Sequence, residues 1–187
     1  MNIEVEIRSF LLQEEYDRLL NFFKEHGKFL SEEDQETWYL QSNKREAISD
    51  KQKENDVRIQ RGIASAKIWM KKGVVHDEAR EEIEIPINPK DFNKIVIFFE
   101  ELDCRPYIKW FRKRITFLWD GITVCLDNTR GYGMILELEK MADDEQREEI
   151  LTFLKEKMKE LGVSLTPREE FEKKYHYYKE NWERLTE

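Results

Sequence analysis

Apolar and charged residues alternate along the first stretch of this chain, residues 3–10. Ile3, Val5 and Ile7 occupy one phase, and charged residues occupy most of the other. A period of two predicts a β-strand with one apolar and one charged face. The pattern returns in residues 37–41, 56–61, 65–72, 80–87, 110–119, 122–127 and 134–141. Asp120-Gly121 between two of these stretches predicts a tight hairpin turn.

Four other stretches change to helical spacing, with apolar residues three or four positions apart. These stretches are residues 11–26, 89–103, 143–162 and 167–185. Gly27 is typical of a helix end and Pro89 of a helix start, and the polar residues 43–55 predict a loop. No repeat or linker divides the sequence, so we expect residues 1–187 to form one α+β domain, with the last helix packed on the sheet or capping it.

The charged phase of the strands carries a segregated set of residues. It holds seven acids and seven bases, namely Glu4, Glu6, Glu82, Glu84, Asp127, Glu137 and Glu139 together with Arg8, Arg58, Lys67, Lys71, Arg80, Arg112 and Arg114. Such strands form either an open sheet with a solvated charged face, or a closed antiparallel barrel that encloses the charges. Because so many strands carry charged residues in one phase, we favour the barrel, with helices outside and a charged lumen.

A charged lumen requires a charged ligand, because unpaired charges are costly at low dielectric. A polyphosphate with divalent cations meets this requirement. Arginine and lysine bind phosphate oxygens, and carboxylates bind Mg²⁺ or Mn²⁺. Residues two apart on a strand project from the same face about 7 Å apart, so an E-x-E pair can hold one ion between its side chains.

The composition limits the other partners. The chain has 40 acids against 32 bases, and an isoelectric point near 5.2 argues against a nucleic-acid-binding face. No uncharged run reaches the roughly 20 residues of a membrane span, and the first residues do not resemble a signal peptide, so we expect a cytoplasmic protein without a membrane partner. Cys104 and Cys125 belong to no C-x-x-C motif and have no histidine beside them, so the sequence predicts neither a disulfide framework nor a zinc site of thiolates.

The last helix carries an aromatic stripe that we expect to pack within the fold or against a second copy in a homodimer: Phe171, Tyr175, Tyr178 and Trp182.

The ordered motifs on the strands resemble the CYTH superfamily, the triphosphate tunnel metalloenzymes that include class IV adenylate cyclases and thiamine triphosphatases. The similar motifs run from Ile3 to about Tyr178: an E-x-E-x-K-like opening at residues 4–8, an R-I-R-like strand at Arg58, an L-T-L-K-like strand at residues 68–71, E-x-E pairs at residues 82–84 and 137–139, a basic strand at residues 112–114, and Asp127. Arg8 stands where lysine is usual, and Thr37 and Gln41 stand where a D-x-Y-x-D strand has acids. The spacing from Asp127 to Glu137 most resembles the cyclase branch.

The resemblance implies a closed eight-stranded antiparallel barrel with about four helices, whose tunnel binds a triphosphate and one or two Mg²⁺ or Mn²⁺ ions. It implies a metal-binding group of Glu4, Glu6, Glu137 and Glu139, with Asp127 near a second ion and Glu82 and Glu84 in the same network. It implies phosphate binding by Arg8, Arg58, Lys71, Arg112 and Arg114, and Lys67 and Arg80 share their phase. We expect catalysis to depend on Glu4, Glu6, Lys71 and Glu137, with Lys72 as the alternative to Lys71. Tyr39 and Arg130 are candidates for contact with the organic part of the substrate.

Three functions fit these residues. The favoured one is a metal-dependent phosphohydrolase that acts on inorganic triphosphate, thiamine triphosphate or a nucleoside triphosphate. The second is an adenylate cyclase that converts ATP to cyclic AMP and pyrophosphate, which the Asp127 to Glu137 spacing favours. The third is a non-catalytic module that binds a polyphosphate or nucleotide; the residues Thr37 and Gln41 favour it, and the intact E-x-E pairs oppose it.

Overall fold

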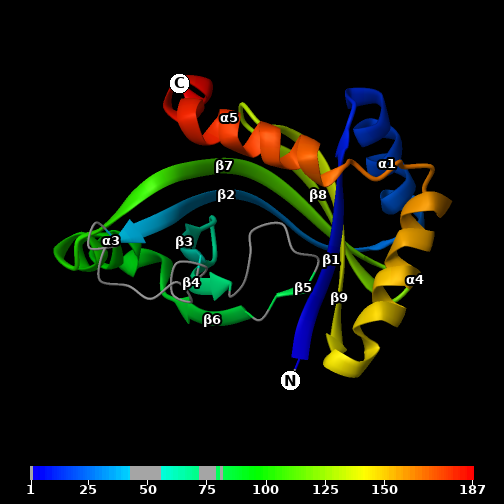
Figure 1. The fold of residues 1–187 in the computed structure, drawn as a ribbon, viewed down its shortest axis with the longest axis horizontal. Helices are drawn as coiled ribbons and strands as arrows, with labels where there is room; N and C mark the ends of the chain where they lie inside the picture. The colour runs from blue at the N-terminus through cyan, green and yellow to red at the C-terminus, as the bar shows by residue number, and fades with distance from the viewer. Residues whose placement is uncertain (1, 43–55, 72–78, 81) are drawn as a thin grey trace.

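The polypeptide forms one antiparallel sheet with helices packed around it (Figure 1). The computed structural model describes residues 2–42, 56–71, 79–80 and 82–187, so the loop expected at residues 43–55 and Lys72 lie outside the described part. The strands are β1 (Asn2–Leu11), β2 (Lys28–Ser42), β3 (Asp56–Arg61), β4 (Ala66–Lys71), β5 (Ala79–Arg80), β6 (Glu82–Ile87), β7 (Cys104–Trp119), β8 (Ile122–Thr129) and β9 (Gly133–Asp143). The helices are α1 (Gln13–His26), α3 (Phe92–Glu101), α4 (Arg147–Glu160) and α5 (Arg168–Thr186), with the short 3₁₀ turns η2 (Pro89–Asp91) and η3 (Asp144–Gln146).

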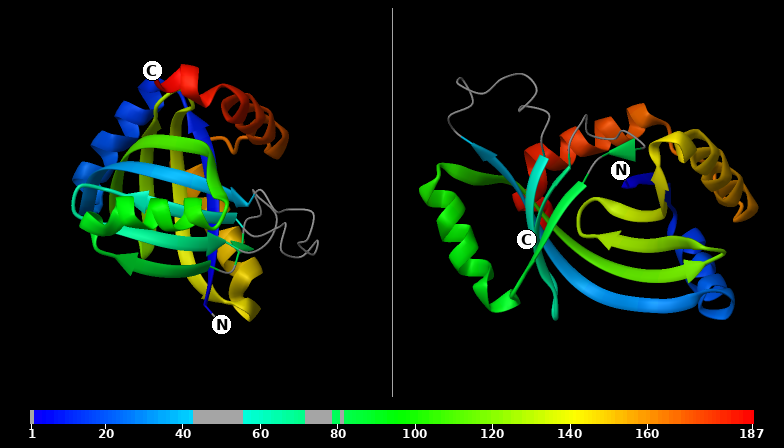
Figure 2. Two further views of the ribbon diagram at one scale, coloured as in Figure 1. Left: turned by 90° about the vertical axis from the view of Figure 1, so that its left-hand side faces the viewer. Right: turned by 90° about the horizontal axis from the view of Figure 1, so that it is seen from below.

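The sheet closes into a barrel because its two edge strands are nearly consecutive in the chain. In the order β5-β1-β9-β8-β7-β2-β3-β4-β6, β5 pairs with β1 and β6 pairs with β4. Residue 81 alone separates β5 from β6, so one run of chain joins the two edges. Inside, Lys71 Nζ on β4 lies 2.8 Å from a carboxylate oxygen of Glu4 on β1, which links the strands across the closure. If β5 and β6 are counted together, the barrel has the expected eight strands. Figure 2 shows the curled sheet from two further sides.

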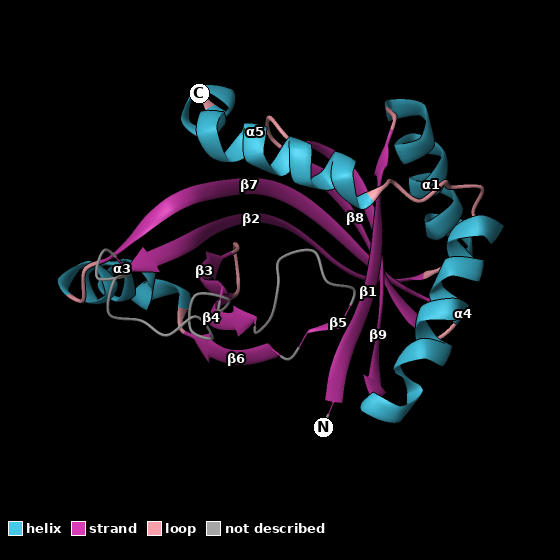
Figure 3. Ribbon diagram, in the orientation of Figure 1, coloured by secondary structure: helices cyan, strands magenta, loops and turns pink. Residues whose placement is uncertain are grey.

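Helices cover much of the apolar phase of the strands on the outside of the barrel (Figure 3), while Ile83 and Ile85 of β6 stay exposed. Phe23 of α1 and Leu154 of α4 are fully buried in one core with Val5 of β1 and Leu138 of β9. Phe92 of α3 packs in a second core on β2 and β3. Each such side chain stabilises the fold by about 1.5–3 kcal/mol through burial, so the apolar phase packs outward and the charged phase faces the lumen. Within the described residues, no helix combines the length and apolar character needed to cross a membrane.

The C-terminal helix α5 packs differently, across one end of the lumen. Its Tyr178 ring stacks on Trp110 of β7 with centroids 4.2 Å apart, and its Phe171 ring stacks on Phe10 of β1 at 4.5 Å. Both strand residues lie in the phase that faces the lumen, two positions from lumen arginines. The helix therefore lies across this end of the barrel, and its aromatic stripe packs against the strands.

The turn between β8 and β9 fits closely under the end of α5. Gly131 in this turn has a φ of 71°, and a Cβ there would lie 2.6 Å from the Cβ of Leu185. The left-handed backbone and the close approach both require glycine at this position. Beside it, Arg130 Nη1 donates a hydrogen bond to the carbonyl oxygen of Thr186 at 3.1 Å, so the turn and the helix end hold each other in place.

The sequence-based lengths of β2 and β7 were wrong. β2 begins at Lys28 rather than residue 37, and β7 begins at Cys104 rather than residue 110. Residues 31–36 are all polar and show no alternation, yet they pair with β7, where Glu33 lies opposite Arg114. Opposite charges on paired strands stabilise the pairing, which apolar periodicity does not detect. Likewise, β9 extends to Asp143, so α4 begins at Arg147 rather than near residue 143.

Candidate active site in the barrel lumen

The barrel encloses a charged cavity of about 390 Å³. The expected residues that line it are Glu4, Glu6, Arg8, Tyr39, Arg58, Lys67, Lys71, Glu82, Glu84, Arg112, Arg114, Glu137 and Glu139. They come from seven strands, β1, β2, β3, β4, β6, β7 and β9. Residues that share one phase in the sequence therefore line one cavity. Both signs of charge face the same space, as a polyanion with a bound cation requires.

Three carboxylates crowd one side of the cavity. One ligand oxygen from each of Glu4, Glu6 and Glu139 lies within 4.8 Å of the others, because Glu6 and Glu139 are opposite each other in the β1 and β9 pair. Burial, then the charges of Glu137 and Glu4, raise the pKa of Glu139 to about 8, and burial also raises the pKa of Glu4. Carboxyl groups this close resist ionisation unless a cation neutralises them. Their hard oxygen donors fit Mg²⁺ or Mn²⁺.

Lys71 lies among these acids. Its Nζ is 2.8 Å from Glu4, 3.4 Å from Glu6 and 3.3 Å from Glu82. Burial alone would lower the pKa of Lys71, but the carboxylates of Glu6 and Glu4 raise it above its ordinary value. The side chain therefore stays an ammonium at neutral pH. It offsets the charge of the acids here, and it can donate to phosphate once those acids bind a cation.

Two arginines of β7 are held by one buried aspartate. Arg114 donates from Nε and Nη2 to the two oxygens of Asp127 at 2.7 Å, and Arg112 Nη1 donates to the same carboxylate at 2.8 Å. Arg114 Nη2 also donates to Glu137 at 2.8 Å. Burial alone would raise the pKa of Glu137, but Arg114 and Arg112 lower it to about 2. Asp127 thus orients the guanidinium groups of both arginines, and its place beside a second metal ion stays a prediction.

Arg58 and Tyr39 form the wall toward α5. The Arg58 guanidinium lies 4.0 Å from the centre of the Tyr39 ring, and Arg58 Nε donates to Asp56 at 3.0 Å. Together with Arg8 and Trp110, they line a recess of about 70 Å³ between the cavity and α5. The indole nitrogen of Trp110 is buried there, without a hydrogen-bond partner among the described residues. The recess therefore brings aromatic side chains beside the arginines.

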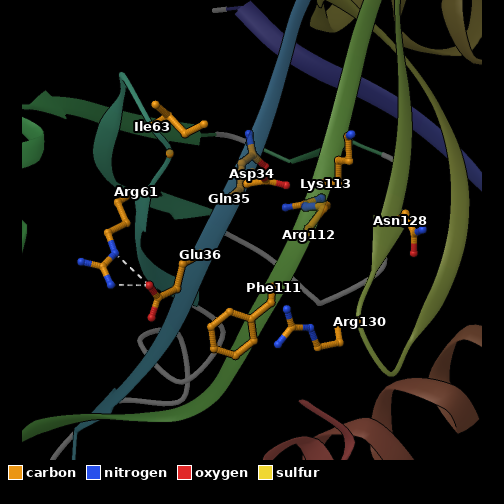
Figure 4. A pocket seen from close by; sticks show the side chains of 11 residues that line it. Asp34, Gln35, Glu36, Arg61, Ile63, Phe111, Arg112, Lys113, Asn128 and Arg130 are labelled. Carbon is orange, nitrogen blue, oxygen red and sulfur yellow. Dashed lines mark hydrogen bonds and ion pairs between the residues drawn. The ribbon is translucent and has the colours of Figure 1, made fainter. Parts of the chain in front are cut away.

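Two of the expected residues with described side chains do not line this cavity: Arg130, and Asp127, which lines the recess instead. Arg130 lies in an open groove of about 700 Å³ on the outside of the barrel, 5.7 Å from the centre of the Phe111 ring (Figure 4). Strand β8 ends at Thr129, and the turn that follows carries Arg130 away from the lumen. The backbone of Arg80 pairs with Glu4 at the barrel closure, and its side chain lies outside the described part.

Five polar or aromatic residues of the cavity wall were not expected from the sequence: Glu33, Gln35, Gln60, Ser65 and Trp69. Glu33 and Gln35 belong to the part of β2 that was missed, so no phase could be assigned to them. Gln60 and Trp69 share the phase of Arg58 and Lys67, and that phase could have identified them. They add hydrogen-bonding and stacking groups to a wall that the sequence represented as charges alone.

Comparison with known proteins agrees with this geometry. The CYTH domain model matches residues 2–175. Solved structures with the same fold include a protein from Pyrococcus horikoshii OT3, 25% identical with a TM-score of 0.71 over 88% of this chain and 93% of that chain, and a conserved hypothetical protein from Pyrococcus furiosus, 25% identical with a TM-score of 0.69 over 88% and 96%. A candidate adenylate cyclase from Vibrio parahaemolyticus, 17% identical, shares the fold with a TM-score of 0.68 over 87% of this chain and 90% of that chain. No curated protein sequence matches the chain. With the barrel, its charged lumen and a family match over nearly its whole length, the chain belongs to the CYTH domain family.

Proposed function

We propose that this protein hydrolyses the triphosphate group of a small molecule with the help of a divalent metal ion. The observation that carries the proposal is the division of charge within one cavity. Three carboxylates gather within 4.8 Å of one another, and the cavity wall beside them carries arginines whose donors are already oriented. Phosphoryl transfer needs little beyond positioning and neutralisation of charge, and these two groups supply both.

Each group has a role in this proposal. Glu4, Glu6 and Glu139 would hold the ion, and Mg²⁺ or Mn²⁺ bound there would supply neutralisation of phosphate charge and an activated water molecule. Arg112 and Arg114 bind phosphate oxygens through paired N–H donors, with Asp127 fixing their planes. Lys71 donates to phosphate when the acids around it are bound to the ion.

Adenylate cyclase is the second candidate, and the aromatic recess favours it. Tyr39 and Trp110 lie beside the arginines, where a base attached to the triphosphate could stack. Cyclisation also requires that the ribose hydroxyl be oriented toward the α-phosphorus, whereas hydrolysis requires only the triphosphate. One structure with this fold, a candidate adenylyl cyclase from Hippeastrum that is 17% identical, is described as having a dominant triphosphatase activity, which supports hydrolysis as the first choice.

Product analysis separates these functions. Purified protein is incubated with inorganic triphosphate, thiamine triphosphate or ATP, each with Mg²⁺ or Mn²⁺. A hydrolase releases orthophosphate, whereas a cyclase releases pyrophosphate and cyclic AMP. Tight binding of triphosphate without any turnover would instead identify the binding module that Thr37 and Gln41 favour, and would refute the proposal.

Glu4→Gln tests the assigned site. The change removes one carboxylate charge at constant size, so metal-dependent turnover should fall on the order of 100-fold, while the circular dichroism spectrum stays unchanged. Glu14→Gln on α1 is the matched control, because Glu14 is exposed outside the barrel. Full activity in Glu4→Gln would contradict the assignment of the acids.

A further inference from the structure

A thiol lies in the lumen wall next to the acids. Cys125 on β8 is 1% exposed and shares the strand phase of Asp127. In the pairing of β8 with β9, Cys125 lies opposite Glu137, and Glu139 follows two residues later. The sulfur of Cys125 and one carboxylate oxygen each of Glu137 and Glu139 all lie within 4.8 Å of one another.

This group differs in chemistry from the three carboxylates described above, although Glu139 belongs to both. Sulfur is a soft donor that Mg²⁺ does not take, whereas Zn²⁺ and Cd²⁺ bind thiolate readily. In a tetrahedral zinc site, metal–donor distances of about 2.0–2.3 Å place the donors roughly 3.6 Å apart. Side-chain shifts of about 1 Å would bring the three donors to that spacing, and Glu137 and Glu139 line the cavity from which a fourth ligand would come.

We propose that Cys125, Glu137 and Glu139 form a second cation site that selects thiophilic divalent ions such as Zn²⁺ and Cd²⁺. On binding, the S–H bond of Cys125 breaks, the sulfur electron pair forms the bond to the cation, and the proton passes to the buffer. No atom changes its oxidation state. The proposal goes beyond the triphosphatase activity and does not depend on it, because it concerns binding of the cation alone.

The two sites compete because they share a ligand. Glu139 can complete the three-carboxylate site or the thiol site, but one carboxylate cannot take both geometries at once. Glu137 accepts a hydrogen bond from Arg114 at 2.8 Å, so a cation bound beside Cys125 also draws Glu137 away from that arginine. A thiophilic ion should therefore oppose Mg²⁺ binding and disturb the phosphate-binding side of the cavity.

The two cysteines of the chain provide a matched test. Cys104 lies at the start of β7 and is not part of the cavity wall, so Cys104→Ser leaves Cys125 as the one remaining thiol. Metal-free Cys104→Ser is titrated with Cd²⁺ while the ultraviolet sulfur-to-metal charge-transfer band is recorded. We expect the band to saturate at one ion per chain, and to be absent from Cys125→Ser. Calorimetry should show Zn²⁺ affinity at least 10-fold weaker in Cys125→Ser, at unchanged Mg²⁺ affinity, as loss of a ligand requires.

Three results would overturn the proposal. The first is a folded Cys104→Ser protein without the band, and this arm decides the question even if Cys125→Ser does not fold. The second is equal Zn²⁺ affinity in the wild type and a folded Cys125→Ser. The third is a Cd²⁺ band that saturating Mg²⁺ does not weaken, which would exclude a shared Glu139. All measurements are made without a phosphate substrate, so a failed triphosphatase assay leaves them unaffected.

Discussion

Replacing Asp127 by asparagine removes the charge that holds two arginines of the cavity wall. In the wild-type protein, Arg112 and Arg114 donate to its oxygens at 2.7–2.8 Å, and Asp127 is 2% exposed. Breaking a buried ion pair costs about 3–5 kcal/mol, because the remaining charge loses its partner. Glu137 still accepts a hydrogen bond from Arg114, so we expect the lower end of this range. A loss of about 3 kcal/mol lowers the melting temperature of a chain of this size by roughly 6–12 °C.

The same variant should regain stability when triphosphate is added. Without Asp127, the donors of Arg112 and Arg114 are free to bind phosphate oxygens. A ligand at 100 times its Kd stabilises the folded state by about 2.7 kcal/mol, so triphosphate should recover most of the loss. Urea unfolding of both proteins, with and without inorganic triphosphate and always with EDTA, measures this recovery.

An opposite pattern would refute this role for Asp127. If the residue binds a second metal ion, as the sequence resemblance implies, Asp127→Asn should weaken Mg²⁺ binding and leave the unfolding free energy of the metal-free protein nearly unchanged. Asp34→Asn is the control, because Asp34 is exposed in the groove outside the barrel. It should change the unfolding free energy by less than about 0.5 kcal/mol.

Two further predictions concern stability. The pKa of Glu139 in the fold, about 8, lies above its ordinary value of 4.5, so its contribution to the stability of the metal-free protein falls as pH rises from 4.5 to about 8. Unfolding in EDTA at several pH values should show this slope reduced in Glu139→Gln, and an equal slope would contradict it. Gly131→Ala should destabilise the protein by about 1–3 kcal/mol in thermal unfolding. Gly121 has a similar φ of 74°, but a Cβ there would meet Lys140 Nζ at 3.7 Å, an ordinary contact. Gly121→Ala should therefore cost less, and equal losses would contradict a role for the contact with Leu185.

Alternation predicted those strands whose outer phase is apolar. Val5 of β1 and Leu138 of β9 are buried under α1 and α4, so the apolar phase was visible in the sequence. The first half of β2 has no such phase. Glu33 there faces the lumen, while Asp34 and Glu36 line the outer groove of Figure 4, so both faces are polar. A periodic pattern reveals a strand only where one of its faces is apolar.

The sequence indicated which residues enter the lumen, but not which of them touch. Asp127 contacts Arg114 because the pairing of β7 with β8 places them opposite each other. Cys125 meets Glu137 for the same reason in the next pair. Strand register depends on turns and on long-range packing, so a metal ligand and a partner of arginine look alike in one sequence. Arg130 shows the same limit, since one residue of turn moves it outside the barrel.

The cap that α5 forms gives the lumen a direction. Within the described residues, Tyr178 and Phe171 cover one end, so under the proposed function a phosphate chain would enter and leave through the opposite mouth. A long polymer would insert a terminus rather than thread through such a channel, and its interior phosphates would stay out of reach of the acids. The fragment nearest α5 would then be the last to leave. Under the proposed function, the C-terminal helix would therefore favour short substrates and the ends of long ones.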